Sequence, residues 1–562
     1  MTSRRAFLQQ TGSLAAGFAA VGSGTFAAES EPVARRQRAA TSFADLHRPP
    51  DIVVVQTATA ERSLRNSGSG RWQDDDITVA TTPAAGALRV ELSSPTTAVR
   101  RIRLRWRARL DDVQQVLGDA WERGYGDLEW RGFVPDRVMP WYAATCDGRV
   151  THVYGVKTGA KAMCFWQIDP QGVTLVSDVR SGGIGVELGA RTLDVCDVVS
   201  REGRENEPAF AAIHAFCRQM CATPRLPAHP VYGSNDWYWA YGKNSAATAL
   251  ADARHIVDLS PTGANRPFAV IDDGWQPERG QAKTGVGTWD RGNEKFPDMA
   301  DLAGKIRGAG ARPGLWVRPL LAPADAPDSW RLPRDRSILD PTISAVRDKI
   351  AADISRVHGW GYELIKHDYS SFDIFGRWGS TMGDALTRDG WTFAAGPART
   401  TAEVIDDLYR TIRTAAGDAL VIGCNTVSHL SAGIFDICRA GDDTSGRDWP
   451  RTRKMGVNTL AFRGAQHGAF YTVDADCVGV TNSIPWALNR QWLDLLSRSG
   501  TMLFVSIAPD ALGDNQRRDL RAALARAAVP QPLGEPLDWR QMAWPRRWRL
   551  MNQDVTYDWM DA

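Results

Sequence analysis

Several acidic residues that could carry out chemistry follow short apolar runs, at the points where predicted strands end. They are Asp272, Asp273, Asp368, Asp442 and Asp443. A single carboxylate at such a position is often structural, because it can cap a helix or fix a turn. Carboxylates that follow several strands of one barrel would instead face one cavity. Paired carboxylates in a sugar-sized cavity suit glycoside hydrolysis, in which one attacks the anomeric carbon and the other protonates the leaving oxygen.

The surroundings of such a pair decide which carboxylate acts as the nucleophile and which as the acid. A retaining enzyme needs its two carboxyl groups about 5–5.5 Å apart, a spacing that two strands of one barrel can supply. Lys366 lies two residues before Asp368, and its positive charge is expected to keep that carboxylate ionised as a nucleophile. Burial among like charges is expected to raise the pKa of the acid, so that it holds a proton near neutral pH.

Eight short apolar runs between residues 231 and 506 predict the strands that position these residues. The runs are 231–233, 267–271, 312–317, 363–367, 419–423, 435–438, 469–473 and 501–506. Amphipathic segments such as 246–259, 345–357 and 401–415 fall between them. Eight strands that alternate with helices predict a (β/α)8 TIM barrel, an α/β fold. A doubly wound sheet is the alternative, but no glycine-rich phosphate loop follows the first strand.

The region before the barrel has a different texture. From about residue 43 to 200, short alternating apolar runs are separated by turn residues, which predicts an N-terminal β-sandwich. We therefore expect four parts in the chain, the last with one helix and a short C-terminal β-type remnant. They are a signal peptide at 1–28, a β-supersandwich at 29–225, the catalytic barrel at 226–510 and a C-terminal region at 511–562.

The N-terminus and the composition set the compartment and the classes of partner. Ser3-Arg4-Arg5-Ala6-Phe7-Leu8 and the apolar stretch 12–28 predict twin-arginine export to the periplasm or the outside. That stretch is too short to span a membrane, and no later segment resembles a span. A net charge of +2 without charged runs argues against nucleic acid as a partner. The 22 tryptophans, 17 phenylalanines and 11 tyrosines exclude a disordered chain.

The eight cysteines are widely spaced, so we expect most of them to be buried free thiols. Cys217 and Cys221 lack a second pair of ligands for zinc. The sequence therefore predicts no metal and no organic cofactor. Most tryptophans are expected to pack in cores, while a few would offer flat faces to a pyranose ring.

A series of motifs in a fixed order resembles the retaining α-galactosidase clan, and glycoside hydrolase family 36 in particular. The motifs are Gly233 to Trp237, Ile271 to Gln276, Gly314 to Trp316, Lys366-His367-Asp368, Gly423 to Asn425, Arg439 to Asp443 and Asp474 to Cys477. The likeness covers roughly residues 231–510, and the raffinose synthase branch shares the second motif together with 293–297. The resemblance implies a β-supersandwich followed by a barrel, an oligosaccharide or glycoside as substrate, and hydrolysis by double displacement.

The same resemblance implies roles for individual residues. Asp368 matches the nucleophile, and Asp443 matches the acid/base of an Arg-x-x-x-Asp pattern, with Asp442 as its adjacent rival. Further residues are implied to bind the sugar: Asp272 and Asp273 at its 4- and 6-hydroxyls, Lys366 and Arg439 on the glycone, Trp237 and Trp316 as walls, Cys424 near the 2-position, and Asn425 as a further substrate-binding residue. Barrel packing is the alternative for Trp237, Trp316 and Cys424. Asp474 and Asp476 are better interpreted as residues that fix loops.

Some features depart from that family and leave alternatives open. His367 lies where relatives carry an apolar or Trp residue, the loop 372–393 is long, and only about 50 residues follow the barrel. A same-clan enzyme with another glycone, N-acetylgalactosamine or β-L-arabinopyranose, is one alternative, and galactosyl transfer to a sugar is another. A non-catalytic sugar-binding protein is the alternative of a different class. Relatives often assemble as homo-oligomers, but no motif here decides the oligomeric state.

Overall fold

A computed structural model describes residues 42–277 and 287–560 of the protein. The predicted signal peptide, residues 1–28, lies outside these described residues. Within the two described ranges, no helix is both long enough and apolar enough to cross a membrane.

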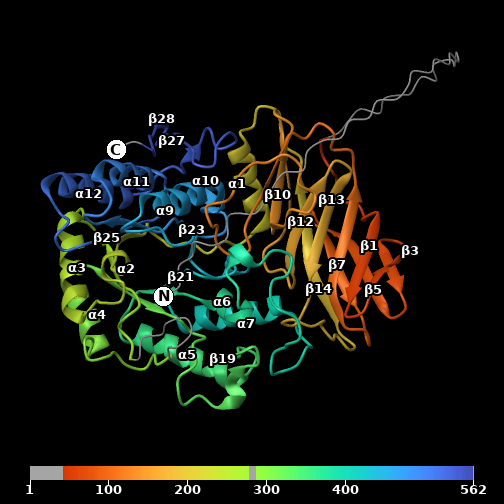
Figure 1. Cartoon of the computed structure of the whole chain (residues 1–562), viewed down its shortest axis with the longest axis horizontal. Coiled ribbons are helices and arrows are strands. Elements are labelled where there is room, and N and C mark those ends of the chain that lie inside the picture. Colours follow the sequence, from red (N-terminus) through yellow and green to blue (C-terminus); the bar gives the residue numbers. More distant parts are fainter. Residues whose placement is uncertain (1–41, 278–286, 561–562) are drawn as a thin grey trace, which may run out of the picture. The chain divides into compact units, whose positions relative to one another are not determined.

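Strands β1 to β14 form two antiparallel sheets, drawn from red to yellow in Figure 1. One sheet has the order β2-β1-β7-β13-β12-β9 and the other β3-β4-β5-β6-β14-β11-β10-β8. Along β1 alternate side chains are buried, which is the pattern of a strand with one face on a core. The predicted N-terminal β-sandwich is therefore confirmed. The bounds are β1 Ile52–Thr57, β2 Glu61–Ser63, β3 Arg65–Gly68, β4 Arg71–Asp74, β5 Ile77–Ala84, β6 Ala87–Ser93, β7 Val99–Arg107, β8 Gln115–Gly118, β9 Met139–Pro140, β10 Tyr142–Cys146, β11 Thr151–Val156, β12 Met163–Asp169, β13 Gly172–Asp178 and β14 Thr192–Arg201.

The next sheet is wholly parallel and has the order β23-β22-β21-β20-β17-β16-β15-β25-β24. Its two outermost strands are consecutive in the chain and are separated only by Ala475 and Asp476. One strand, interrupted at Asp476, thus pairs with β22 through its first part and with β25 through its second. With β23 and β24 counted as one, the nine strands of this sheet become eight and close on themselves. This confirms the predicted (β/α)8 barrel. The bounds are β15 Tyr232–Asn235, β16 Phe268–Ile271, β17 Arg312–Val317, β20 Leu364–His367, β21 Leu420–Gly423, β22 Ile437–Arg439, β23 Thr472–Asp474, β24 Cys477–Val480 and β25 Leu503–Ile507.

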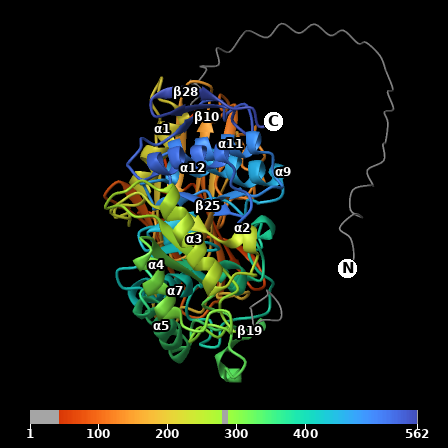
Figure 2. The same cartoon turned by 90° about the vertical axis from the view of Figure 1, so that its left-hand side faces the viewer.

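Helices connect these strands, and Figure 2 views them from the side of α3, α4 and α12. Capping residues fix where two of them begin: the Ser245 side chain accepts from the Thr248 backbone N–H, and Thr400 accepts from that of Glu403. The predicted helices at 246–259 and 401–415 are found with the same bounds. The helical segments are α1 Ala209–Met220, α2 Trp237–Ala240, α3 Ala246–Leu259, α4 Met299–Gly308, η1 Asp328–Trp330, α5 Ser344–Gly359, α6 Ser370–Phe375, η2 Gly379–Thr381, α7 Thr401–Ala415, α8 Ser428–Ser431, α9 Trp449–Thr452, the π-helix η3 Arg453–Asn458, α10 Thr459–Arg463, η4 Gly464–Gln466, α11 Trp486–Arg498 and α12 Asp514–Ala527.

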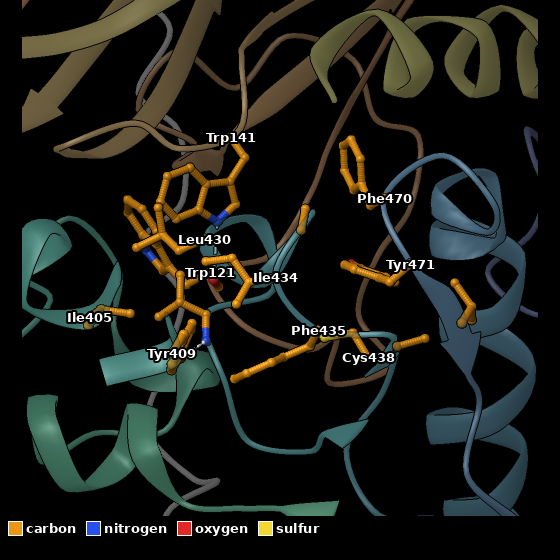
Figure 3. Close-up of a cluster of buried hydrophobic side chains, with 14 of the residues drawn as sticks. Trp121, Trp141, Ile405, Tyr409, Leu430, Ile434, Phe435, Cys438, Phe470 and Tyr471 are labelled. Carbon is orange, nitrogen blue, oxygen red and sulfur yellow. Dashed lines mark hydrogen bonds between the residues drawn. The ribbon is translucent and has the colours of Figure 1, made fainter. Parts of the chain in front are cut away.

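Sandwich and barrel share one hydrophobic core, part of which is drawn in Figure 3. Trp121 and Trp141 come from the sandwich region, and the Trp141 ring stacks on His429 of the barrel with centroids 4.8 Å apart. Phe470 packs against the other side of this cluster, edge-on to His429 at 5.5 Å. Each large apolar side chain buried in this way contributes about 1.5–3 kcal/mol. Separating the sandwich from the barrel would expose this core to water.

A short antiparallel sheet follows the barrel, as the sequence predicts. It consists of β26 Glu535–Pro536, β27 Arg547–Leu550 and β28 Gln553–Thr556. One further two-stranded piece, β18 Arg331–Leu332 with β19 Asp335–Leu339, lies in the connection after β17. The eight cysteines all lie in the described residues, where all are buried and free, which confirms the expectation of unpaired thiols.

Candidate active site

Most of the predicted site residues meet at the carboxyl ends of the barrel strands. Tyr369 shows that these residues lie close together, because its phenol interacts with carboxylates at the ends of three strands. Burial raises the pKa of Tyr369, and the charges of Asp368, Asp443 and Asp273 raise it further. These carboxylates follow β20, β22 and β16 respectively. The barrel therefore brings them to one place, as the sequence predicts.

Lys366 of β20 pairs with Asp272 at the end of β16, and β17 lies between these two strands in the sheet. Its Nζ lies 2.6 Å from Asp272 Oδ2, which also accepts a hydrogen bond of 2.8 Å from the Asn235 amide. Burial lowers the pKa of Lys366, but the charge of Asp272 outweighs this effect and holds the pKa well above its ordinary value. Lys366 is thus a fixed cation, and its ion pair is with Asp272 rather than with the predicted partner Asp368.

The turn after β16 presents Asp273 next to this pair. The Gln276 amide donates to Asp273 Oδ1 at 2.7 Å, which orients the carboxylate. Gly274 has a φ of +124°, and a Cβ there would lie 2.5 Å from the Asn244 side chain. Only glycine fits this turn, which explains why the Asp272–Gln276 motif has a glycine at this position.

Asp368 is oriented by two N–H donors. The Trp316 indole donates to Oδ2 at 3.0 Å, and the Tyr369 backbone N–H donates to Oδ1 at 2.8 Å. Tyr369 has a φ of 68°, in the left-handed region that non-glycine residues seldom adopt. The strained residue directly after Asp368 places its N–H on the carboxylate. Trp316 is almost fully buried, and its indole N–H holds the Asp368 carboxylate.

His367 makes packing contacts rather than polar ones. Its ring packs edge-on against Tyr409 and Phe435, with centroids 5.7 and 5.5 Å away, and it is fully buried. Neither ring nitrogen has a hydrogen-bond partner among the described residues. Burial lowers the pKa of His367 to about 3, so the ring is neutral. The histidine therefore replaces an apolar residue in a packing position.

Arg439 is the centre of a second group of charges. Its guanidinium lies 3.0 Å from Asp476, 3.3 Å from Asp443 and 3.4 Å from the sulfur of Cys424. Asp476 also accepts from the backbone N–H of Thr444 at 2.7 Å, so it fixes the loop after β22, as expected of it. Burial, followed by the charge of Asp368, raises the pKa of Cys424, which keeps the thiol protonated.

Asp442 and Asp443 have different surroundings. Asp442 is held by Arg123 at 2.8 Å and by Arg451 at 2.9 Å. Asp443 keeps 40% of its side chain exposed and lies 3.3 Å from Arg439. Asp443 is thus the carboxylate that a bound molecule can reach, while Asp442 is tied to the protein.

The prediction that like charges raise the pKa of Asp443 is wrong for this structure. Burial does raise it, but the positive charges of Arg439, Arg123, Lys366 and Arg451 together hold the pKa of Asp443 below its ordinary value. Sequence reasoning counted the neighbouring carboxylates and missed the cations, of which Arg123 lies more than 300 residues earlier in the chain.

Two other predicted residues are less clearly placed toward a sugar. Asn425 is fully buried, and its amide donates to Glu122 at 2.5 Å and accepts from the Phe372 backbone at 3.2 Å. Trp237 is half-buried at the start of α2, with its ring 5.5 Å from that of Tyr241. Their roles in binding remain predictions.

The structure adds three residues that the sequence did not single out. Asp236 accepts the Asp272 backbone N–H at 2.8 Å, and burial, then the charge of Asp272, raise its pKa to about 8. Its position inside the Gly233–Trp237 motif is the sequence feature that could have pointed to Asp236. Arg318 and Asp373 form a fully buried pair at 2.6 Å beneath Tyr369. No local pattern marks either residue.

We compared the sequence and the structure with those of known proteins. No family model matches the sequence, and no curated protein matches it. Solved structures do match. An α-galactosidase from Thermus thermophilus, in complex with p-nitrophenyl α-D-galactopyranoside, has a TM-score of 0.58 at 19% identity and covers 90% of this chain and 99% of its own.

The chain has the fold of these α-galactosidases. The family 36 enzyme AgaA from Geobacillus stearothermophilus has a TM-score of 0.59 at 15% identity, covering 89% of this chain and 79% of its own. The α-galactosidase from Lactobacillus brevis has a TM-score of 0.54 at 13% identity, with coverages of 86% and 74%. The fold implied by the sequence resemblance is therefore confirmed.

Proposed function

We propose that the protein is a retaining glycoside hydrolase that cleaves terminal α-galactosidic bonds. The observation that carries the proposal is the contrast between two carboxylates at one end of the barrel. Asp368 is oriented by two N–H donors, as a nucleophile requires, and Asp443 is partly exposed beside Arg439. The structural likeness to α-galactosidases supports galactose as the glycone.

The reaction would proceed by double displacement. Asp368 attacks the anomeric carbon while the bond to the leaving oxygen breaks, and Asp443 gives that oxygen its proton. The sugar is then held as an ester of Asp368. In the second step Asp443 takes a proton from water, the water oxygen attacks the anomeric carbon, and the Asp368 carboxylate is released.

The charges of the site favour this exchange of roles. A bound sugar would displace water from Asp443, which favours its protonated form. When Asp368 becomes a neutral ester, one negative charge disappears and the surrounding cations act on Asp443 more strongly. Its pKa then falls, so the acid of the first step becomes the base of the second.

Glycone recognition would rest on the cluster after β16 and β20. Asp272 and Asp273 offer carboxylate oxygens to two sugar hydroxyls, and Lys366 offers an ammonium group. Such charged hydrogen bonds contribute about 1.5–3 kcal/mol each. A sugar that lacks a matching hydroxyl would lose one of these hydrogen bonds.

The test is turnover of an aryl α-D-galactoside beside a panel of aryl glycosides. The panel includes α-N-acetylgalactosaminide, β-L-arabinopyranoside and α-glucoside, and Asp368→Ala is the control. We expect turnover of the galactoside and its loss by a factor on the order of 10⁴ in the variant. Preference for another glycone would contradict the proposed substrate. Sugar binding without turnover by the native chain would contradict the enzyme itself.

We also propose that the chain is exported by the twin-arginine route, on the strength of its Arg4-Arg5 motif. Cell fractionation of the full chain beside an Arg4→Lys/Arg5→Lys variant tests this. Native protein outside the cytoplasm and variant protein retained inside it are expected. An equal distribution of the two would contradict the route.

A further inference from the structure

The segment of residues 119–125, here called the bridging segment, connects the sandwich to the active site of the barrel. It follows sandwich strand β8 and runs alongside the end of β22. The Gly124 N–H donates to Ala440 O at 2.7 Å, and the Asp442 N–H donates to Gly124 O at 2.8 Å. Backbone hydrogen bonds on both sides thus fix the bridging segment against the residue that precedes Asp443.

A close steric fit supports this pairing. A Cβ on Gly441 would lie 2.5 Å from the backbone oxygen of Met455, and one on Gly124 would lie 3.0 Å from the Thr459 side chain. The two glycines therefore allow the backbones of the bridging segment, the β22 loop and the η3 helix to approach each other. No larger residue fits at Gly441 without moving one of these backbones.

Buried charges fasten the bridging segment at Asp119 and at Glu122. Asp119 pairs with Arg463 at 2.8 Å, and both side chains are almost completely buried. Arg463 also donates to Glu122 O at 2.8 Å and to Ala440 O at 3.1 Å. The Glu122 carboxylate accepts from Tyr125, Ser371, Asn425 and the Gly379 N–H.

Arg123 lies in the middle of this fixed segment and points at the two adjacent carboxylates. Its Nη2 is 2.8 Å from Asp442, its Nη1 is 3.8 Å from Asp443, and only 7% of its side chain is exposed. Its Nε has no hydrogen-bond partner among the described residues. The guanidinium also lies 5.5 Å from the centroid of the Trp378 ring, in the long loop after β20.

We propose that Arg123 is a positioning residue for the acid/base of the barrel. It ties down Asp442, leaves Asp443 as the carboxylate that receives and gives the proton, and sets the pH range in which Asp443 can act. The N-terminal region thereby completes the active site of the barrel. This proposal rests on the proposed function, in which Asp443 is the acid/base.

Other charged groups also face Asp443, and the effect of Arg123 on this carboxylate must be separated from theirs. Arg439 comes from β22, Lys366 from β20, Arg451 from α9, and the phenols of Tyr238 and Tyr369 from α2 and the end of β20; Asp442 and Asp476 are the nearby carboxylates. Arg439 and Lys366 are each committed to another carboxylate at 3.0 Å or less. Arg123 spans Asp442 and Asp443 with a single guanidinium. Its removal takes an ion-pair partner from both of these carboxylates together.

The variant Arg123→Gln keeps hydrogen-bond donors and removes the charge. Because a nearby positive charge favours the ionised form, its loss favours the protonated form of Asp443. The alkaline limb of kcat/KM should therefore move to higher pH. Each profile is scaled to its own maximum. One pH unit above the native midpoint, the variant should retain at least about three times as much of its activity as the native enzyme does.

Two further variants separate a charge effect from a structural one. Arg123→Lys keeps a positive charge and should return the alkaline limb toward the native position. Arg451→Gln removes the other arginine of Asp442, which contacts Asp442 but not Asp443 at ion-pair distance. Because Arg451 is a weaker influence on Asp443 than Arg123 is, the profile of this variant should move less than that of Arg123→Gln. Thermal unfolding of each variant shows whether it is folded.

Carboxyl ¹³C NMR of aspartate-labelled protein reads the same quantity without turnover, with the Asp443 signal assigned from Asp443→Asn. An upward shift of the Asp443 titration that is larger in Arg123→Gln than in Arg451→Gln supports the inference even if no glycoside is hydrolysed. An unchanged titration in folded Arg123→Gln, or an equal shift in both variants, overturns it. If the native protein hydrolyses none of the glycosides in the panel, that result would count against the proposed function alone.

Discussion

Two groups of charges at the bridging segment contain the same residue types, but one is fully buried and the other is open to solvent on one side. The fastening cluster, Asp119 with Arg463 and Gln466, is closed: Asp119 accepts from Arg463 at 2.8 Å and from Gln466 at 2.9 Å, and both ions are almost fully buried. The catalytic cluster, Arg439 with Asp443 and Lys366, is open on one side, because 40% of the Asp443 side chain is exposed.

Unused hydrogen-bonding capacity is the second difference. Arg439 Nε and Arg123 Nε are buried without hydrogen-bond partners among the residues described. Leaving such a group unpaired costs about 1–3 kcal/mol. The fastening cluster uses its charges to hold two parts of the fold together. The catalytic cluster instead combines a buried donor atom without a hydrogen-bond partner among the described residues with a carboxylate that stays partly exposed.

The largest expected effect comes from the open cluster. Asp443→Ala removes the acid, so a substrate with a poor leaving group, such as an α-galactosyl disaccharide, should lose up to about 10⁴-fold in kcat/KM. An aryl galactoside with an acidic phenol needs little protonation and should lose far less. Steady-state kinetics on both substrates checks this. Equal losses on the two would contradict the role of Asp443 as acid, and Asp442→Ala is the matched comparison.

The next effect comes from the closed cluster. Asp119→Asn leaves Arg463 as a buried charge without its partner, which should lower the free energy of unfolding by about 3–5 kcal/mol. Denaturant unfolding followed by tryptophan fluorescence measures the change. The matched control is Asp554→Asn, whose pair with Arg549 is half-exposed and should contribute much less, because solvent screens it. A similar loss in both variants would mean that burial does not distinguish the two pairs.

A smaller effect concerns the neutral histidine beside the nucleophile. The folded-state pKa of His367 is about 3, below the ordinary 6.5 of an unfolded histidine. The unfolded chain thus binds a proton that the folded chain rejects. The stability that comes from a neutral His367 is complete above pH 6.5 and is lost as the pH falls from 6.5 toward 3.

The variant His367→Phe has no such group. It should therefore gain stability relative to the native chain as the pH falls, by about 2 kcal/mol at pH 5 compared with pH 8. Unfolding of both proteins at these two pH values isolates the effect, since titrations of other residues cancel in the difference. A difference that does not change with pH would mean that His367 has the same pKa in the folded protein as in the unfolded chain.

Much of the fold could be predicted from local patterns. Runs such as Pro267–Ile271 and helices such as Ala246–Leu259 are fixed by apolar periodicity and capping residues, and the structure has them where the sequence places them. Asp368 and Asp443 could be singled out because they follow such strands. These signals all lie within a few residues of the position that they predict.

The rest depends on contacts across the chain. Arg123 meets Asp442 from 319 positions earlier in the sequence, and the pKa of Asp443 follows from cations on four separate segments. Asp236 gave a weak signal, because a lone Asp after a strand also occurs as a helix cap. A sequence pattern can place a carboxylate at a strand end, but only the folded structure shows which charges surround it.

The most direct test of this account is to trap the covalent intermediate on Asp368. A 2-deoxy-2,2-difluoro-α-galactoside with a good leaving group slows both steps, and its leaving group lets the first step proceed faster than the second, so the glycosyl-enzyme should accumulate. Mass spectrometry of the digested protein would then locate the sugar. We expect one equivalent on the peptide that contains Asp368, and none in Asp368→Ala. A label on another residue, or turnover of α-galactosides with inversion at the anomeric carbon, would contradict the account.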